Sequence, residues 1–482
     1  MKKSIWLFII ISLLAVFMGV TVFCEEAQQL DCQVADTNFT DTAALFDSNR
    51  QSYITVDSEA TLTIKAGKNI EHLYIEFDLM PEGWEIVNPV SKKSYTVDDG
   101  FLHQYVNISE AMGGAMSSFT LTFPRGTSIA DIYFFSEGEL PSWVQTWSVP
   151  CDKADIMLVS AHSDDEHLFF AGVLPYYAIE RQLQVQVVYS VQHFSVNDDR
   201  NHVRPHEQLD GLWTVGVRSY PVMTDFPDVY SESTNRNTAF TQAEAAFGAH
   251  GITYDDFCSY LTECIRRFKP LVVITHGLDG EYGHGTHVLC ASAVTEAIGY
   301  AADAEKYPES YEKYGSWQVE KTYLHQYEEN KITMDWDTPY DSLGGKTPFQ
   351  VTQDGFRRHQ SQHWCWFYNW LYGNNGWITK ATQITHYSPC DYGLYDSRVG
   401  QDVTGGDFME NVIPWSQREQ AQEQEPAEET REDHYRDYDT AERTSQDKYS
   451  RSNKTITLLI IIAVTVVAVA VVLLIAFLIK LI

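Results

Sequence analysis

Residues 155–167 read DIMLVSAHSDDEH, and this stretch decides the fold. Its first half is a continuous apolar run, which is typical of a parallel strand covered on both faces. Its second half ends that run in histidine and acidic residues and leads into an apolar stretch of helical length, 167–182. Further apolar runs at 185–191 and 271–275 alternate with segments of helical length. The alternation predicts βαβ units and an open, mostly parallel sheet over residues 152–400.

Two clusters of metal-ligand residue types lie where strands are expected to end. The first strand ends in AHSDDEH (161–167), and the third apolar run is followed by HGLDGEYGHGTH (276–287). Ligands of open parallel sheets bind outside the carboxyl ends of the strands, so we expect the two clusters to meet. His162 and Asp165 can share one ion across a tight turn, and His287 can supply a third ligand. Two histidines and one carboxylate, with a coordination position left open, are typical of a catalytic zinc site.

Two further side chains fit the chemistry of a metal-dependent hydrolase. Bound metal lowers the pKa of a water towards about 7 and polarises a carbonyl oxygen. Asp164, adjacent to a ligand but pointing elsewhere, can take the proton of that water. His284, one helical turn before His287, can stabilise the oxyanion or protonate a leaving amine.

The same residues also have purely structural explanations. His162 and His287 would then be capping or core histidines, and the acidic run would be a solvated helix start, the role we expect for Glu166. Two such clusters at adjoining strand ends favour the metal site. Ser163 is disfavoured as a nucleophile because no G-x-S-x-G turn accompanies it.

The two clusters together resemble the LmbE/PIG-L family of zinc-dependent N-deacetylases, whose opening motif is AHPDDE and whose later motif ends in H-x-x-H. The resemblance covers roughly 152–300, and Ser163 stands where the family usually has proline. It implies a Rossmann-like domain that binds Zn²⁺ or another divalent metal. The implied roles are metal ligands for His162, Asp165 and His287, general base for Asp164, and acid or oxyanion stabiliser for His284. Arg204 and Glu207, in RPHEQLDGLWTVGV, match the family's R-x-x-E stretch and are implied substrate contacts. His276, His359 and Gln362 are candidates for lining the pocket.

Residues 30–150 predict a separate β-sandwich. Short runs rich in β-branched and aromatic residues are separated by turn residues, as at 60–66, 72–78, 118–124 and 130–136. Their order loosely resembles a galactose-binding-like (discoidin-like) module. Such a module binds sugars through its loops or acts as a spacer.

The two ends of the chain are strongly apolar. Residues 1–24 predict a signal peptide or signal anchor, and residues 455–479 form an uncharged stretch long enough for a transmembrane helix. The polar segment 416–454 predicts a disordered stalk. These features predict a membrane-anchored protein with its domains on the extracytoplasmic face, although the basic residues before the last apolar stretch oppose the positive-inside tendency.

The composition of the chain limits the classes of ligand that it can bind. The chain has 66 acidic and 34 basic residues, a formal net charge of −32, which argues against nucleic acid as a partner. We therefore expect a zinc-dependent hydrolase that removes acetyl from an N-acetylated amino sugar, in a glycan or a glycolipid. Two alternatives stay open: a metal hydrolase of another ester or amide bond, and a non-catalytic surface glycan-binding protein. The sequence leaves the oligomeric state and the pairing of the cysteines open.

Overall fold

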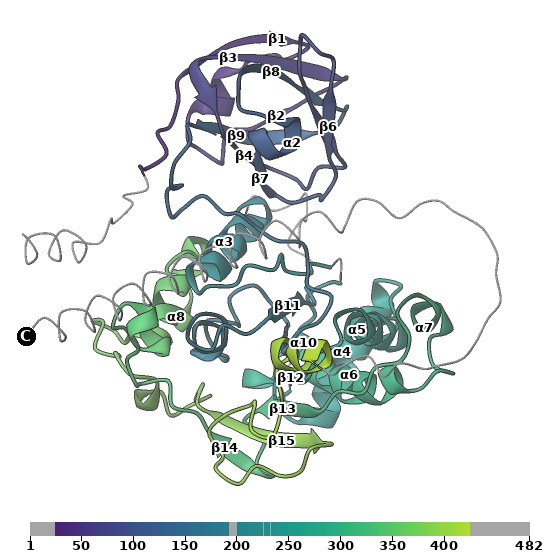
Figure 1. The fold of residues 1–482 in the computed structure, drawn as a ribbon. Helices are drawn as coiled ribbons and strands as arrows, with labels where there is room; N and C mark the ends of the chain where they lie inside the picture. The colour runs from purple at the N-terminus through teal and green to yellow at the C-terminus, as the bar shows by residue number, and fades with distance from the viewer. Residues whose placement is uncertain (1–24, 192–199, 225, 232, 425–482) are drawn as a thin grey trace, which may run out of the picture. The chain divides into compact units, whose positions relative to one another are not determined.

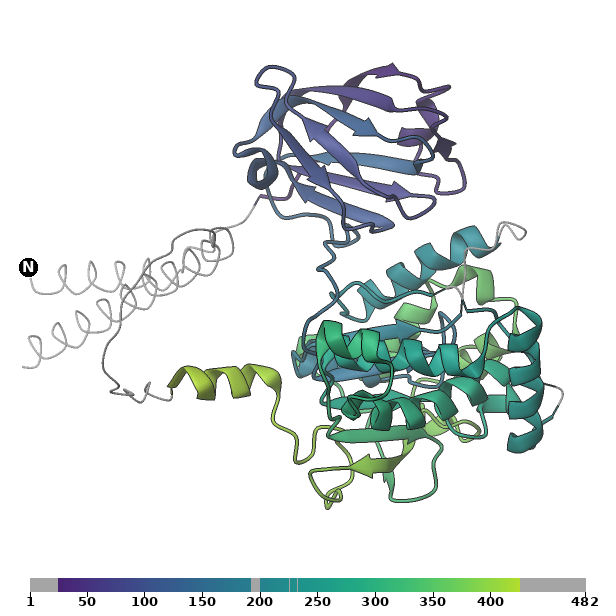
Figure 2. The same cartoon turned by 90° about the vertical axis from the view of Figure 1, so that its right-hand side faces the viewer.

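The chain folds into a β-sandwich followed by an α/β domain. The computed structural model describes residues 25–191, 200–224, 226–231 and 233–424. Up to Gln422 they belong to one compact unit. The sandwich and the layered α/β domain are both visible in Figures 1 and 2.

The sandwich consists of two antiparallel sheets. The first has the strand order β1-β3-β8-β5-β6, with β1 at Cys32–Thr37, β3 at Ala60–Ile70, β8 at Met116–Phe123, β5 at Trp84–Val87 and β6 at Ser94–Val97. The second has the order β2-β9-β4-β7, with β2 at Ile54–Thr55, β9 at Ser128–Phe135, β4 at His72–Phe77 and β7 at His103–Asn107. Two short helices complete it, η1 at Ala43–Phe46 and α2 at Ile108–Met112.

Buried and partly exposed residues alternate along the first sheet of the sandwich. Along β3, Ala60, Leu62 and Ile64 are buried while the residues between them are partly exposed, so one face packs on the core. The residues of β4 and β9 are buried along their whole length, because the second sheet is covered on both faces. The four strands expected near residues 60, 72, 118 and 130 are thus present as β3, β4, β8 and β9. The likeness to a galactose-binding module stays a prediction.

The α/β domain is built on a six-stranded sheet of order β11-β10-β12-β13-β15-β14. Its strands are β10 at Ile156–Ser160, β11 at Val185–Tyr189, β12 at Val272–Thr275, β13 at Lys321–His325, β14 at Lys331–Thr333 and β15 at Asp391–Ser397. The first four strands of the order are parallel, whereas β15 runs antiparallel to both β13 and β14. The sheet is therefore mixed, which corrects the predicted mostly parallel sheet.

Helices cover both faces of this sheet (Figure 1). The longer ones are α3 at Arg200–Thr214, α4 at Arg236–Ala249, α5 at Tyr254–Phe268, α6 at Gly285–Ala302, α8 at Pro348–Phe356 and α10 at Trp415–Gln424. The shorter ones are η2 at Pro175–Glu180, η3 at Glu281–Gly283, α7 at Pro308–Tyr314, η4 at Asp341–Leu343, η5 at Gln360–Gln362, α9 at Trp366–Tyr372 and η6 at Ala381–Gln383.

The residues of β10 show why both faces need cover. Met157 and Val159 pack with the apolar side chains of α4, α5 and α6. Ile156 and Leu158 point the other way, into a core shared with α3 and η2. A strand such as β10, with four consecutive apolar residues, is stable only in such a two-sided environment.

The segment expected to form a long helix at 167–182 differs from the prediction. It consists of turns up to residue 172 and a single π-helical segment, η2. Gly172 has a φ of +92° and Pro175 opens η2, and both residues disfavour a continuous α-helix. The apolar content of the stretch reflects burial, since Leu168 to Ala171 are fully buried.

The predicted membrane architecture also needs correction. Within the described residues, the structure contains no helix that combines the length and the apolar character needed to cross a bilayer. The longest described helix, α6, has 18 residues and is buried inside the α/β domain. The predicted signal (1–24) and transmembrane helix (455–479) lie outside the described residues. Neither the C-terminal transmembrane helix nor the extracytoplasmic membrane location is retained.

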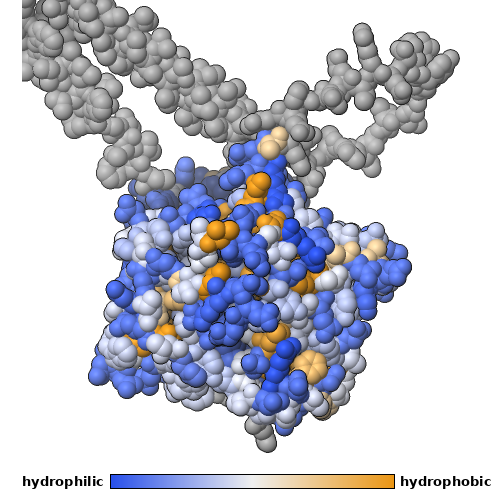
Figure 3. Space-filling view, turned by 90° about the horizontal axis from the view of Figure 1, so that it is seen from below, coloured by the Kyte–Doolittle hydropathy of each residue, from blue (hydrophilic) through white to orange (hydrophobic). Residues whose placement is uncertain are grey.

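Polar residues dominate the face of the α/β domain drawn in Figure 3, where hydrophobic residues are scattered among hydrophilic ones.

The start of the segment predicted as a stalk forms α10, and residues 425–454 lie outside the described part.

Candidate metal centre

The two clusters expected to meet do so at the carboxyl ends of β10 and β12. His162 and Asp165 lie in the turn after β10, and His287 lies in the first turn of α6, which follows β12. β10 and β12 are neighbours in the sheet, so their ends are adjacent. All three side chains are buried.

The three side chains aim one atom each at a common point. His162 Nδ1 lies 3.1 Å from Asp165 Oδ2 and 3.1 Å from His287 Nε2, and His287 Nε2 lies 3.3 Å from Asp165 Oδ2. Ligands bound tetrahedrally to zinc at about 2.0–2.1 Å are separated by about 3.3 Å. The spacing therefore matches that of ligands to one ion.

The outer nitrogens of both histidines are held by carboxylates. His162 Nε2 lies 2.9 Å from Asp228 Oδ1, and His287 Nδ1 lies 2.7 Å from Glu281 Oε2. If these nitrogens carry the protons and donate to the carboxylates, each histidine turns a lone pair towards the common point, where Asp165 also places an oxygen. Three electron-rich atoms so close together need a cation, so the donor set fits a metal ion.

The charged groups around the cluster also favour a positive charge between the three side chains. Burial alone would lower the pKa of His162, but the carboxylates of Asp228 and Asp165 raise it to about 10. Burial is likewise outweighed at His287, where Asp165 and Glu281 raise the pKa to about 9. Burial would raise the pKa of Asp165, but the positive charges of His287 and His162 hold it well below its usual range. The surroundings thus favour positive charge here.

Asp164 sits beside this cluster in an unusual backbone conformation. Its φ is +129°, which is rare for a residue other than glycine and marks local strain. The carboxylate points towards Arg204, whose Nη2 lies 3.7 Å from Oδ2. Burial raises the pKa of Asp164 to about 7, with the charge of Arg204 opposing the shift.

His284 lies on the other side of the cluster. Its ring contacts those of His162 and His287, with centroids 4.7 and 4.8 Å away. Burial, with the charges of the same two histidines, lowers the pKa of His284 to about 2. Tyr230, 71% exposed, packs on the outer side of this ring.

Arg204 and Glu207 lie on α3 and make different contacts. Arg204 Nη2 donates to the backbone oxygen of Ser163 at 2.9 Å, so it holds the turn that carries Asp164. Glu207 accepts hydrogen bonds from the backbone N–H and hydroxyl of Ser361. Arg204 is thus at the candidate centre, whereas Glu207 fixes the segment after α8.

Sequence reasoning missed two carboxylates. Glu281 lies inside the quoted HGLDGEYGHGTH motif and contacts His276, His287 and His325 at 2.5–2.7 Å. Asp228 belongs to a loop with no recognisable motif, and only the fold brings it to His162. The position of Glu281 among histidines is a signal that could have been used. His276, expected to line the pocket, is instead fully buried behind Asp165, 3.5 Å from its carboxylate.

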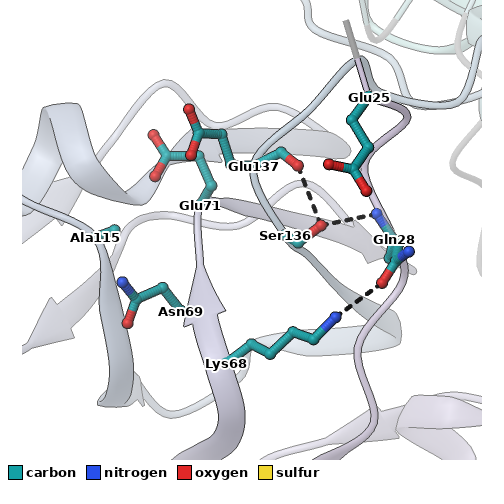
Figure 4. A pocket seen from close by; sticks show the side chains of 8 residues that line it. All are labelled: Glu25, Gln28, Lys68, Asn69, Glu71, Ala115, Ser136 and Glu137. Carbon is teal, nitrogen blue, oxygen red and sulfur yellow. Dashed lines mark hydrogen bonds between the residues drawn. The ribbon is translucent and has the colours of Figure 1, made fainter.

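Pockets in the described part of the chain lie beside Glu281, beside α3 and in the sandwich. One of about 410 Å³ is lined by residues at the ends of β12 and β13, Glu281 among them. A larger one of about 1030 Å³ lies between the sandwich and α3 and includes Glu207. A third, of about 260 Å³, belongs to the sandwich alone and is lined by polar residues such as Glu71 and Lys68 (Figure 4). Its lining includes none of the candidate metal ligands.

Comparison with known proteins places the site in a family context. Residues 157–298 match the family described as PIG-L: GlcNAc-PI de-N-acetylase. Two relatives are 1D-myo-inositol 2-acetamido-2-deoxy-alpha-D-glucopyranoside deacetylases. The one from Streptomyces scabiei is 23% identical over 210 residues, 40% of this chain and 63% of the relative. The one from Mycobacterium leprae is 29% identical over 189 residues, 35% of this chain and 58% of the relative.

The chain therefore spans less than two thirds of the length of these relatives. Among solved structures, N,N'-diacetylchitobiose deacetylase from Pyrococcus horikoshii has 13% sequence identity and a TM-score of 0.36, covering 55% of this chain and 89% of that one. The resemblance to LmbE/PIG-L deacetylases is supported for the α/β part of the chain.

Proposed function

We propose that the chain is a metal-dependent N-deacetylase that releases acetate from an N-acetylated amino sugar. The observation that carries the proposal is the convergence of His162 Nδ1, Asp165 Oδ2 and His287 Nε2, with both histidines oriented by carboxylates. The match of residues 157–298 to the PIG-L family supports the same reaction. Two histidines and one carboxylate are a donor set typical of Zn²⁺. A metal ion bound there would activate water and polarise the amide carbonyl.

The neighbouring side chains have distinct roles in this proposal. Asp164 accepts the proton of the attacking water, and Arg204 keeps its carboxylate in place through the contacts to Ser163 and Asp164. His284, neutral because its pKa is lowered to about 2, donates a hydrogen bond to the developing oxyanion, and Asp164 returns the proton taken from water to the departing amine. The substrate enters from the side of Asp228, whose side chain is 31% exposed, whereas the ligands are buried.

The substrate class follows from the relatives and the charge. The relatives are named as deacetylases of an N-acetylated glucosamine conjugate. A chain with a net charge of −32 repels anionic polymers, so neutral N-acetylated sugars and oligosaccharides are the expected substrates.

Acetate release by the full-length protein from a panel of N-acetylated amino sugars tests the proposal. We expect release that stops after chelation and returns with Zn²⁺. Asp164→Asn should lower kcat by at least about 100-fold, the usual contribution of general-base catalysis, while leaving the metal content unchanged. Asp152→Asn, at an exposed position, is the matched control and should keep full activity.

Two results would contradict the proposal. One is the absence of acetate release from every N-acetylated sugar by metal-loaded protein that cleaves an ester or another amide. The other is full activity in Asp164→Asn.

A further inference from the structure

A second group of buried metal-ligand residues lies outside the candidate centre. Glu166, His167 and His359 can each place one ligand atom within 4.8 Å of the others. Glu166 and His167 follow Asp165 in the turn after β10, and His359 lies between α8 and η5. Each is at most 1% exposed.

The contacts within this group are spaced for an ion. Glu166 Oε1 lies 3.4 Å from His167 Nε2 and 3.7 Å from His359 Nε2. Among the described residues, neither Glu166 Oε1 nor either ring nitrogen of His167 meets the geometry of a hydrogen bond, although the Tyr189 hydroxyl lies against Glu166. Burying such groups without a partner is unfavourable, and a shared divalent cation removes the penalty for both.

The surrounding helices leave room for this arrangement. A Cβ atom at Gly211 of α3 would lie 2.6 Å from His167 Nε2 and 2.7 Å from His359 Nε2. A Cβ atom at Gly355 of α8 would lie 2.6 Å from His167 Cε1. Glycine is unfavourable inside a helix, so its presence at both positions has a packing reason. The two glycines keep the imidazole rings accessible to one another.

We propose that Glu166 Oε1, His167 Nε2 and His359 Nε2 bind a second divalent metal ion, Zn²⁺ or a similar transition metal. Two imidazoles and one carboxylate are the same donor set as in the candidate centre. The site has a positioning role, because the other oxygen of Glu166 accepts the backbone N–H of Asp164 at 2.8 Å. The ion ties the segment after α8 to the turn that carries the candidate base.

Metal counting tests this proposal without reference to any activity. The full-length protein is reconstituted with excess Zn²⁺ and desalted, and the metal is measured by mass spectrometry. We expect two equivalents for the parent chain and one for the His167→Gln/His359→Gln variant. The variant His162→Gln/His287→Gln should lose the other equivalent, and His250→Gln, at an exposed position, should keep both.

Glu166→Gln provides a second route to the same answer, since it removes the charge of the carboxylate with little change of shape. Circular dichroism confirms the folding of each variant. One equivalent in the parent chain, or two in folded His167→Gln/His359→Gln or Glu166→Gln protein, would overturn the proposal. These counts are independent of acetate release, so the deacetylase proposal can fail separately.

Discussion

At the scale of single residues, Glu281 organises the candidate centre. Its buried carboxylate contacts three histidines, His276, His287 and His325, and His287 among them is the proposed ligand. Burial would raise the pKa of Glu281, but the surrounding histidines hold it well below its usual range. The carboxylate therefore fixes the orientation of His287 while remaining ionised.

We expect Glu281→Gln to weaken metal binding. An amide in place of this carboxylate accepts the His287 N–H more weakly, and outer partners of metal ligands are worth about 10–100-fold in affinity. Competition with a coloured chelator measures the change. Glu312→Gln, at an exposed position of α7, serves as the control. An unchanged dissociation constant in Glu281→Gln would show that the carboxylate does not orient His287.

At the scale of elements, α5 begins with a complete capping box. Thr253 Oγ1 accepts the backbone N–H of Asp256 at 3.1 Å, and the Asp256 carboxylate accepts the Thr253 backbone N–H at 2.8 Å. These hydrogen bonds lower the pKa of Asp256. Because the pKa is lower in the folded chain than in the unfolded chain, the carboxylate stabilises the fold at neutral pH, and this contribution is lost as the pH falls.

Asp256→Ala should therefore cost about 0.5–1 kcal/mol in the free energy of unfolding at pH 7. The difference from the parent chain should shrink as the pH falls through about 4, where the unfolded carboxyl group becomes protonated. Urea unfolding at several pH values gives both numbers. Glu244→Ala, on the exposed face of α4, should show no such trend. An equal loss at every pH would contradict the role given to the charge.

At the scale of the whole molecule, helix α3 is shared by the two halves. Its Arg204 faces the candidate centre, whereas His206 and Asp210 contact the sandwich. Arg50 bridges Glu76 of β4 and Asp210 of α3 at 2.6 Å each. Burial lowers the pKa of His103 to about 3, so it is neutral and hydrogen-bonds to His206 at 2.7 Å.

Arg50→Ala should destabilise the protein by about 2 kcal/mol, less than for a fully buried pair, because Arg50 is 31% exposed. The loss arises chiefly at Glu76, which is 2% exposed and would be left without its cation. Denaturant unfolding of the full-length chain measures it. Arg125→Ala removes an exposed arginine of the sandwich and is expected to have no effect. Equal stability of the two variants would mean that the bridge contributes nothing.

Much of the α/β domain could be predicted from sequence because β10, β11 and β12 are short, largely apolar runs, which is a local signal. The antiparallel strand β15, DYGLYDS, lacks that signal because glycine and aspartate interrupt its apolar residues. The grouping of His162, Asp165 and His287 could be expected from the adjacency of strand ends. Asp228 could not, since its approach to His162 depends on the path of a loop. Glu166, expected only to start a helix, is instead fully buried.

The contacts between the sandwich and the α/β domain along α3 limit which modules could replace the sandwich. Phe101 of the sandwich stacks on Tyr220 of the α/β domain with ring centroids 4.1 Å apart, and the Tyr220 hydroxyl accepts a hydrogen bond from the backbone N–H of Leu102 at 2.9 Å. Gene shuffling that exchanged the sandwich for another module would strip Asp210 and His206 of their partners at once. A replacement module would therefore have to present an equivalent of Arg50 and His103 to α3 for the α/β domain to keep these contacts.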